Sequence, residues 1–383
     1  MVEKKVNIAV VGLNFGAQFA PIYQLHPDVE VVGICDTNED LLNEYGDKFG
    51  FKERYTSLDQ VLNSGKYDAV HLLTPIHSHA RPTLDVLNAG LHCACAVPMA
   101  TALEELEAIV EAQKISGKNY MMMETAIYTY QYLHAKEMKS KGEFGQIQFL
   151  RGAHYQDMEN WPDYWMGLPP MHYATHAIAP LLAISEARAI KVHCFGSGSM
   201  REELQQQYNN PYPIETAIFQ LDKENLCAEV TRSLFNTARD YMESFNVYGE
   251  NSSLEWHIEQ EPLHLFQMGP LPQEGWRKIQ HKEVRAVARP ELLPTEISKY
   301  MEHHDHLEEN NPHISVLQGE AHHGSHPHLV HEFIRSIVEK RKPFVDAVTA
   351  ANWTAAGICA HESAMNGGVG VDIPVFEGSP LTK

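Results

Sequence analysis

The chain has 383 residues, of which 44% are hydrophobic and 21% are charged, with a formal net charge of −20 at pH 7. This length allows two domains with separate cores, and the composition excludes intrinsic disorder. The negative charge argues against nucleic acid or an anionic membrane surface as a partner and suits a small neutral substrate better than an anionic one.

Residues 1–125 alternate strand-like and helix-like segments, the pattern of a parallel, doubly wound sheet. The expected strands are short, apolar and bounded by Gly, Asp or Pro, as strands covered on both faces should be. They are residues 6–11, 29–35, 69–73, 92–96 and 120–123. Apolar residues at helical spacing predict helices at 40–49, 80–88 and 103–116.

After residue 125 the pattern changes to helices mixed with strands of alternating polarity. We expect helices at 128–141, 173–185, 327–340 and 347–365, and strands at 147–155, 189–196, 214–221, 226–235 and 245–249. Alternating polarity is typical of antiparallel strands with one covered face. Residues 258–320, rich in Pro, Glu and His, are predicted to be long loops or insertions.

These patterns predict an α/β protein of two domains. Residues 1–125 would form an N-terminal Rossmann domain with a doubly wound parallel sheet. Residues 126–383 would form a C-terminal α+β domain on an open, mainly antiparallel sheet, with helix 347–365 packing back near the Rossmann domain. An exposed sheet face would favour a homo-oligomer, a dimer or tetramer.

The six cysteines are scattered, and Cys93 and Cys95 lack the CxxC spacing of a zinc site. We expect buried free thiols in a reducing compartment. The apolar stretch 6–11 is too short for a signal peptide, and there is no apolar run of about 18 residues. The sequence therefore predicts a cytoplasmic protein with no membrane partner.

The first expected strand ends in Gly12-Leu-Asn-Phe-Gly-Ala17, close to the dinucleotide fingerprint GxGxxG/A. Gly12 suits the tight turn and Ala17 the helix–strand packing, whereas Asn14 replaces the second glycine. Asn tolerates positive φ, so we expect the turn to survive. Asp36 ends the second strand, where an acid binds a ribose 2′-hydroxyl and favours NAD over NADP. The alternative is that Asp36 only caps the next helix.

Three more segments carry a family resemblance: Leu73-Thr-Pro-Ile-His-Ser-His79, Gly90-Leu-His-Cys-Ala-Cys-Ala-Val-Pro98 and His172-Tyr-Ala-Thr-His176. With the fingerprint, they resemble the glucose–fructose oxidoreductase / inositol dehydrogenase / rhizopine catabolism (Gfo/Idh/MocA) family over nearly the whole chain. The resemblance implies NAD(P)-dependent oxidation or reduction of a hydroxyl carbon of a sugar, inositol or related polyol. Some members use a tightly held NAD in redox-neutral chemistry such as glycosidic-bond cleavage.

The expected cofactor is NAD. The resemblance places Thr74, Pro75 and His79 along it. The full set of candidate cofactor-binding residues is Gly12, Asn14, Phe15, Gly16, Asp36, Thr74, Pro75, His77, His79 and Pro98.

Two positions depart from the family pattern. The Glu-Lys-Pro signature falls on Ala96-Val97-Pro98, so the lysine that assists proton transfer is absent. The Asp-x-x-x-His pair falls on His172 and His176, so the aspartate has become histidine. Both changes lie in the catalytic signature.

Hydride transfer from an alcohol carbon requires a base near the hydroxyl proton. Val97 cannot serve, whereas His176 can, because imidazole titrates near neutrality. If this segment is helical, His172 projects on the same face and could orient the substrate. We therefore expect His176 and His172 to be catalytic. Two alternatives stay open: ordinary buried polar residues, or an HxxxH pair that binds a divalent metal.

Further metal ligands, if any, would come from Glu124, His154, Asp157 or the histidines of 322–328, but we assign no metal site. The candidate substrate-binding residues are Glu124, His154, Trp165, His323 and His326. The aromatic loop of Trp161, Tyr164 and Trp165 either stacks on sugar rings or packs a domain junction.

The leading hypothesis is an NAD-dependent oxidoreductase acting on a hydroxyl carbon of a sugar, inositol or glycoside. A second hypothesis is redox-neutral, NAD-assisted cleavage or elimination of a glycoside. A third is a non-catalytic NAD-binding or sugar-sensing protein, because the family lysine is missing.

Overall fold

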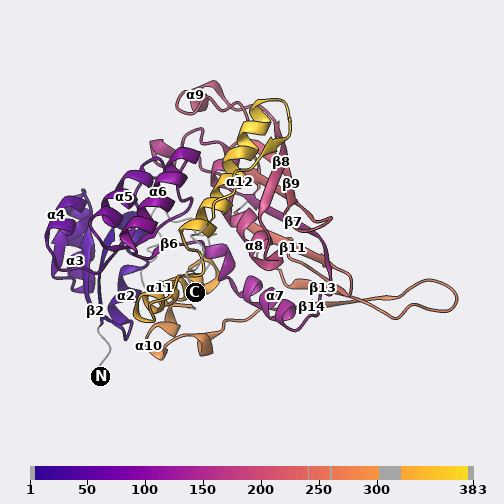
Figure 1. The fold of residues 1–383 in the computed structure, drawn as a ribbon, viewed down its shortest axis with the longest axis horizontal. Coiled ribbons are helices and arrows are strands. Elements are labelled where there is room, and N and C mark those ends of the chain that lie inside the picture. The colour runs from indigo at the N-terminus through magenta and orange to yellow at the C-terminus, as the bar shows by residue number, and fades with distance from the viewer. Residues whose placement is uncertain (1–4, 240, 259–260, 302–320, 378–383) are drawn as a thin grey trace. The chain divides into compact units, whose positions relative to one another are not determined.

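The computed structural model describes residues 5–239, 241–258, 261–301 and 321–377. The described chain forms two compact units (Figure 1). The first contains residues 5–125, 289–301, 321–354 and 376–377, and the second contains the described parts of 126–288 and 355–375. The long helix α12 (Ala347–Met365) contributes its first residues to one unit and the rest to the other.

The first unit contains a six-stranded, all-parallel sheet in the order β3-β2-β1-β4-β5-β6. Its strands are β1 (Val6–Val11), β2 (Val29–Cys35), β3 (Glu53–Tyr55), β4 (Ala69–Leu72), β5 (His92–Cys95) and β6 (Tyr120–Met122). The predicted doubly wound Rossmann sheet is confirmed. Strands β1 and β4 are almost entirely buried, because helices cover both faces of a parallel sheet.

The helices of the first unit connect these strands or follow the second unit in the chain. They are α1 (Leu13–Gly16), α2 (Ala20–Leu25), α3 (Glu39–Phe49), α4 (Leu58–Asn63), α5 (Ala80–Asn88), α6 (Leu103–Ser116), α10 (Thr295–Ser298) and α11 (Ala321–Val338). Short 3-10 helices lie at Ile76–Ser78, Pro290–Leu292 and Lys299–Met301, and a further one, Thr125–Ile127, begins at the last residue of the segment 5–125 and continues into the second unit.

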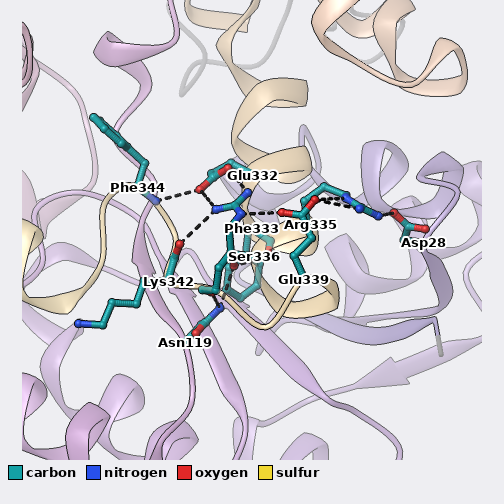
Figure 2. A network of polar contacts seen from close by, with 10 residues as sticks. Asp28, Asn119, Glu332, Phe333, Arg335, Ser336, Glu339, Lys342 and Phe344 are labelled. Carbon is teal, nitrogen blue, oxygen red and sulfur yellow. Dashed lines mark hydrogen bonds and ion pairs between the residues drawn. The ribbon is translucent and has the colours of Figure 1, made fainter. Parts of the chain in front are cut away.

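Helix α11 is fixed to the first unit by polar contacts (Figure 2). The guanidinium of Arg335 donates to Asp28, which precedes β2, at 3.0 Å. The side-chain amide of Asn119, which precedes β6, donates to the Ser336 hydroxyl at 2.9 Å. These contacts explain why residues from the end of the chain belong to the N-terminal unit.

The second unit contains a nine-stranded mixed sheet in the order β14-β13-β12-β11-β7-β10-β9-β8-β15. Its strands are β7 (Ile147–Tyr155), β8 (Ala189–Ser197), β9 (Ile214–Leu221), β10 (Cys227–Ser233), β11 (Met242–Gly249), β12 (Ser252–Glu255), β13 (Leu263–Met268), β14 (Ile279–Val284) and β15 (Val371–Asp372). Only the β7–β10 pair is parallel among its described pairings, which confirms the mainly antiparallel sheet.

One face of this sheet is covered by helix α8 (Thr175–Ser185), which packs on β7, β10 and β11. The approach is close: a Cβ atom on Gly152 would lie 2.3 Å from the carbonyl oxygen of Ala177. The unit also contains α7 (Tyr130–Ser140), α9 (Glu202–Gln205) and the 3-10 helices η3 (Asp163–Trp165) and η4 (Pro170–Tyr173).

The expectation that residues 258–320 consist of loops or insertions is wrong in its described part. Strands β13 and β14 lie in this segment and pair in antiparallel register from Leu263 with Val284 to Met268 with Ile279. Figure 1 shows them ending in a long hairpin loop. Residues 302–320 lie outside the described residues.

No helix in the described ranges is long and apolar enough to cross a membrane.

Candidate functional site

The loop after β1 is held against the chain that follows β4. Gly12 has a φ of 93°, and a Cβ atom there would lie 2.4 Å from the carbonyl oxygen of Leu73. Its backbone amide donates to the carbonyl oxygen of Cys35 at 2.9 Å. Only glycine fits this tight turn, because any other side chain would collide with the neighbouring backbone.

Asp36 follows β2, and its carboxylate is fixed by two backbone amides. Leu13 donates to Oδ2 at 2.7 Å and Asn38 donates to Oδ1 at 2.8 Å. The cap of α3 is Asn38, whose side chain accepts from the amides of Asp40 and Leu41. The alternative that Asp36 only caps this helix is therefore wrong. Its carboxylate lies against the dinucleotide loop, where an acid can accept hydrogen bonds from a ribose.

Asn14 occupies the position of the fingerprint's second glycine without adopting positive φ. It lies within the helical turn α1 and its side chain is exposed. The turn survives, as expected, but it needs no positive φ at Asn14, because the positive φ lies at Gly12. Gly16 packs closely, since a Cβ atom there would lie 2.9 Å from Val10 Cγ1.

Phe15 of this loop contacts residues that enter the first unit from the end of the chain. Its ring centroid lies 5.5 Å from that of His326 and 6.2 Å from that of His322. The buried His326 ring also packs on Phe19 at 4.3 Å. The structure thus brings two candidate residues, Phe15 and His326, together, while the half-buried His323 lies in the same turn at the start of α11.

The remaining candidates of the first unit follow β4, β5 and β6, at the carboxyl edge of the sheet. After β4, Pro75 and His77 are exposed, Thr74 is half-buried and His79 is buried. The Val97–Pro98 peptide after β5 is cis. Glu124 follows β6 and is fully buried. Ligands of open α/β sheets bind at this edge.

In the second unit, His176 lies between a phenol and a carboxylate. Its Nε2 is 3.3 Å from the Tyr173 hydroxyl, and its Nδ1 is 3.7 Å from Glu243 Oε1. The Tyr241 hydroxyl donates to the same carboxylate oxygen. The His154 ring lies 5.2 Å from that of His176. His176 is buried, whereas Tyr173 is half-buried.

A buried cation lies over the ring of Tyr173. The Arg232 guanidinium lies 5.2 Å from the Tyr173 ring centroid and donates to the Tyr173 carbonyl oxygen at 2.9 Å. It also donates to the carbonyl oxygen of His154 and to the side chain of Gln156. Burial lowers the pKa of Arg232 to about 10, so the group stays charged at neutral pH.

His172 belongs to a different group of contacts. His172 lies in η4, which ends before α8 begins, whereas His176 lies in α8. The two side chains therefore do not share one helical face. The His172 ring lies 5.0 Å from that of His361, whose Nδ1 is 2.6 Å from Glu215 Oε1. Burial, and then the neighbouring His361, lower the pKa of His172 to about 3. His172 is therefore a neutral imidazole at physiological pH.

The aromatic loop packs against Tyr173. The Trp165 ring, nearly buried, lies 4.9 Å from that of Tyr173 and 5.8 Å from that of Trp161. The Tyr164 ring lies 5.6 Å from that of Trp165. Trp165 thus supports the phenol, and the half-buried Trp161 and Tyr164 leave part of their rings accessible.

Sequence reasoning missed Tyr173, Glu243, Arg232, Glu215 and His361. A signal existed for three of them. Glu215 and Arg232 occupy covered positions in strands β9 and β10, where buried and accessible residues alternate, and Glu243 is buried in β11. Charged residues at such positions are rarely buried without a partner or a function.

Within the described ranges, no group of three or more His, Cys, Asp or Glu side chains is arranged to hold a metal ion. Asp157, one of the ligands considered, instead accepts from the backbone amide of Glu159 at 3.2 Å.

Residues 6–124 match the model of the oxidoreductase family with an NAD-binding Rossmann fold, GFO_IDH_MocA. Over these residues the chain is similar to the Gfo/Idh/MocA family. The resemblance noted in the sequence is confirmed, and so is NAD as the cofactor. The turn at Gly12 and the fixed carboxylate of Asp36 fit a dinucleotide.

Among curated relatives, glycosyl hydrolase family 109 protein 2 of Akkermansia muciniphila is 27% identical over 223 residues, covering 51% of this chain and 47% of the relative. The chain spans less than half the length of the first curated relatives it matches.

Two similar solved structures cover nearly the whole chain. Levoglucosan dehydrogenase in complex with NADH and levoglucosan has a TM-score of 0.76 at 19% identity, over 97% of this chain and 100% of that one. Myo-inositol 2-dehydrogenase from Lactobacillus plantarum has a TM-score of 0.74 at 16% identity, with the same coverage. These likenesses establish the fold of both units.

Proposed function

We propose that this protein is an NAD-dependent oxidoreductase that acts on a hydroxyl carbon of a sugar, inositol or glycoside. The observation that carries the proposal is the position of His176 between the Tyr173 hydroxyl and the Glu243 carboxylate. The names of the similar structures, which include a sugar dehydrogenase and an inositol dehydrogenase, support this substrate class.

NAD, when bound, accepts a hydride from the carbon that carries the reacting hydroxyl. The residues of this chain then have to remove the hydroxyl proton. In our proposal the half-buried Tyr173 hydroxyl meets the substrate, and His176 Nε2 accepts the proton behind it. Glu243 faces Nδ1 and stabilises the imidazolium that forms, while the Arg232 charge above the ring stabilises a phenolate.

This arrangement offers a route around the missing family lysine. Val97 is nearly buried and cannot exchange a proton. The phenol–imidazole–carboxylate chain supplies three groups of the required type from η4, α8 and β11. His172, which stays neutral, would donate a hydrogen bond to the substrate or accept one from it. The accessible faces of Trp161 and Tyr164 would contact the sugar ring.

Redox-neutral cleavage of a glycoside is the second candidate function. The curated relatives named as glycosyl hydrolases of family 109 favour it. In that scheme the hydride returns to the sugar, so substrate would be consumed without accumulation of free NADH.

The test is a panel of inositols, sugars and aryl glycosides incubated with the protein and NAD, read by absorbance of NADH and by chromatography of products. Net oxidation predicts equal amounts of NADH and oxidised product. Glycoside cleavage predicts products without free NADH. An absence of turnover over the whole panel, with intact NAD binding, would favour the sensor hypothesis and overturn the proposal.

On the substrate so found, His176→Gln and Tyr173→Phe should each lower kcat roughly 10²–10⁴-fold, the usual contribution of a positioned acid–base group. NAD affinity should barely change. His257→Gln is the matched control, because His257 is an exposed histidine of the same unit. Full activity of both His176→Gln and Tyr173→Phe would show that this site assignment is wrong.

We also propose a homo-oligomer and a cytoplasmic location. Apolar side chains on the sheet face opposite α8 support the first, since Phe195 is 61% and Ile218 45% exposed. All six cysteines are free, which suits a reducing compartment. Sedimentation of the full chain would measure the oligomeric state.

A further inference from the structure

Both ring nitrogens of His79 face backbone carbonyl oxygens. Nδ1 lies 2.7 Å from the oxygen of Pro98, and Nε2 lies 2.9 Å from the oxygen of Thr74. Carbonyl oxygens only accept hydrogen bonds, so both nitrogens must donate. A neutral imidazole has a single N–H and would direct a lone pair at one of the two oxygens. The geometry therefore requires the doubly protonated imidazolium.

The surroundings of the ring favour this charged form. His79 is 2% exposed, and burial by itself lowers its pKa. The neighbouring Cys95 and the Pro98 and Thr74 carbonyl oxygens outweigh burial and raise the pKa of His79 to about 9. Cys95, on β5, is the titratable side chain that acts on this ring among the described residues.

The charge lies at the cofactor-binding edge of the sheet. Thr74 follows β4 and Pro98 follows β5, whereas Asp36 follows β2, on the other side of β1. A dinucleotide spans this edge with one nucleotide on each side of the central strand. If Asp36 holds the adenosine ribose, the nicotinamide half lies over the two loops that His79 joins.

We propose that His79 is a positioning residue that stays protonated at neutral pH, ties the loops after β4 and β5 together and binds NADH more tightly than NAD through its charge. NADH carries one negative charge more than NAD, because its nicotinamide ring is neutral. A buried cation at the loops after β4 and β5 would therefore favour the reduced cofactor. The inference rests on NAD as cofactor and not on the substrate or reaction proposed above.

The first experiment is nitrogen NMR of the full chain with labelled histidine. At about pH 7, one histidine absent from the spectrum of His79→Gln should show two protonated ring nitrogens, and it should titrate well above the usual range. A signal of a neutral tautomer at this pH would overturn the proposal. If His79→Gln does not fold, His79→Asn gives the same assignment.

The second experiment is calorimetric titration with NADH and NAD, which needs no substrate. His79→Gln should weaken NADH binding roughly tenfold and NAD binding clearly less, because a charge and not only a shape is lost. Wild-type affinity for NADH should fall between about pH 7 and pH 10, and that of His79→Gln should change less.

His92→Gln is the matched control. His92 lies at the opposite end of β5, and its ring accepts from the backbone amide of Asn119 at 2.9 Å, a contact that glutamine can replace. The affinities of His92→Gln for NADH and for NAD should equal those of the wild type. Equal losses of NADH and NAD affinity in His79→Gln would show that the residue only supports the loops and would overturn the electrostatic role.

Discussion

At the scale of single residues, Asp36 decides the choice between the two nicotinamide cofactors. Its carboxylate is oriented by the amides of Leu13 and Asn38 and would repel a 2′-phosphate. The wild type should bind NAD more tightly than NADP. Asp36→Asn keeps an acceptor oxygen but removes the charge, so it should reduce the ratio of NAD affinity to NADP affinity roughly tenfold. Calorimetry with both cofactors measures it, and tighter binding of NADP by the wild type would contradict the prediction.

Single residues also show where sequence reasoning stops. Gly12, Asp36 and His176 could be singled out because each belongs to a motif with fixed spacing along the chain. The carboxylate beside His176 could not, since Glu243 lies on β11 and the contact depends on how α8 packs over that strand. The protonation of His79 likewise depends on two carbonyl oxygens supplied by different loops.

At the scale of elements, buried strands and long helices were predicted most accurately. The bounds of β1, β2, α5, α6, β7 and α12 agree with the sequence analysis, because burial imposes a periodic pattern of apolar residues. Strand β14 was missed because its residues are almost all exposed and need no apolar alternation. The short strand β3 was missed because Glu53, Arg54 and Tyr55 are only half-buried at the edge of the sheet.

The end of α11 offers a test of how the returning helix is held. Glu332 accepts from both terminal nitrogens of Arg341, at 2.6 and 2.7 Å. It also accepts from the backbone amide of Phe344 at 2.8 Å (Figure 2). Its side chain is 17% exposed. Glu332→Gln should lower the free energy of unfolding by about 1–2 kcal/mol, because a bidentate ion pair with Arg341 is lost from a partly buried site. Urea denaturation gives this quantity.

Glu339→Gln is the comparison for that measurement. Glu339 pairs with Arg335 and Arg341, but its side chain is 40% exposed, so solvent screens the interaction. Glu339→Gln should therefore lower the free energy of unfolding by less than about 1 kcal/mol. A cost as large as that of Glu332→Gln would mean that partial burial does not decide the strength of these pairs.

At the scale of the whole molecule, the histidines shape the dependence of stability on pH. Burial lowers the pKa of five of them, to about 3 for His71 and His172, to about 4 for His26 and His92, and below its usual range for His331. Below pH 6.5 the unfolded chain binds protons at these sites that the folded chain does not bind. Stability therefore falls as the pH drops from 6.5 toward 4.

His79 acts in the opposite direction. Its pKa is raised to about 9, so its contribution is complete below pH 6.5 and is lost as the pH rises from 6.5 through 9. The loss is on the order of 3 kcal/mol. The two effects together place the maximum of stability near pH 6.5, with a steeper decline on the acid side, where five groups act instead of one.

We expect the free energy of unfolding, measured by urea denaturation from about pH 4 to pH 9.5, to fall by several kcal/mol per pH unit on the acid side. A typical total stability of about 5–15 kcal/mol would then be exhausted before about pH 4. On the acid side, His71→Asn should reduce the slope of the free energy of unfolding against pH by the contribution of one proton, because the buried His71 ring that resists protonation is removed. His257→Asn, at an exposed position, should leave this slope unchanged. A maximum above pH 8, or an acid limb that His71→Asn does not alter, would show that these buried rings do not control the stability of the fold.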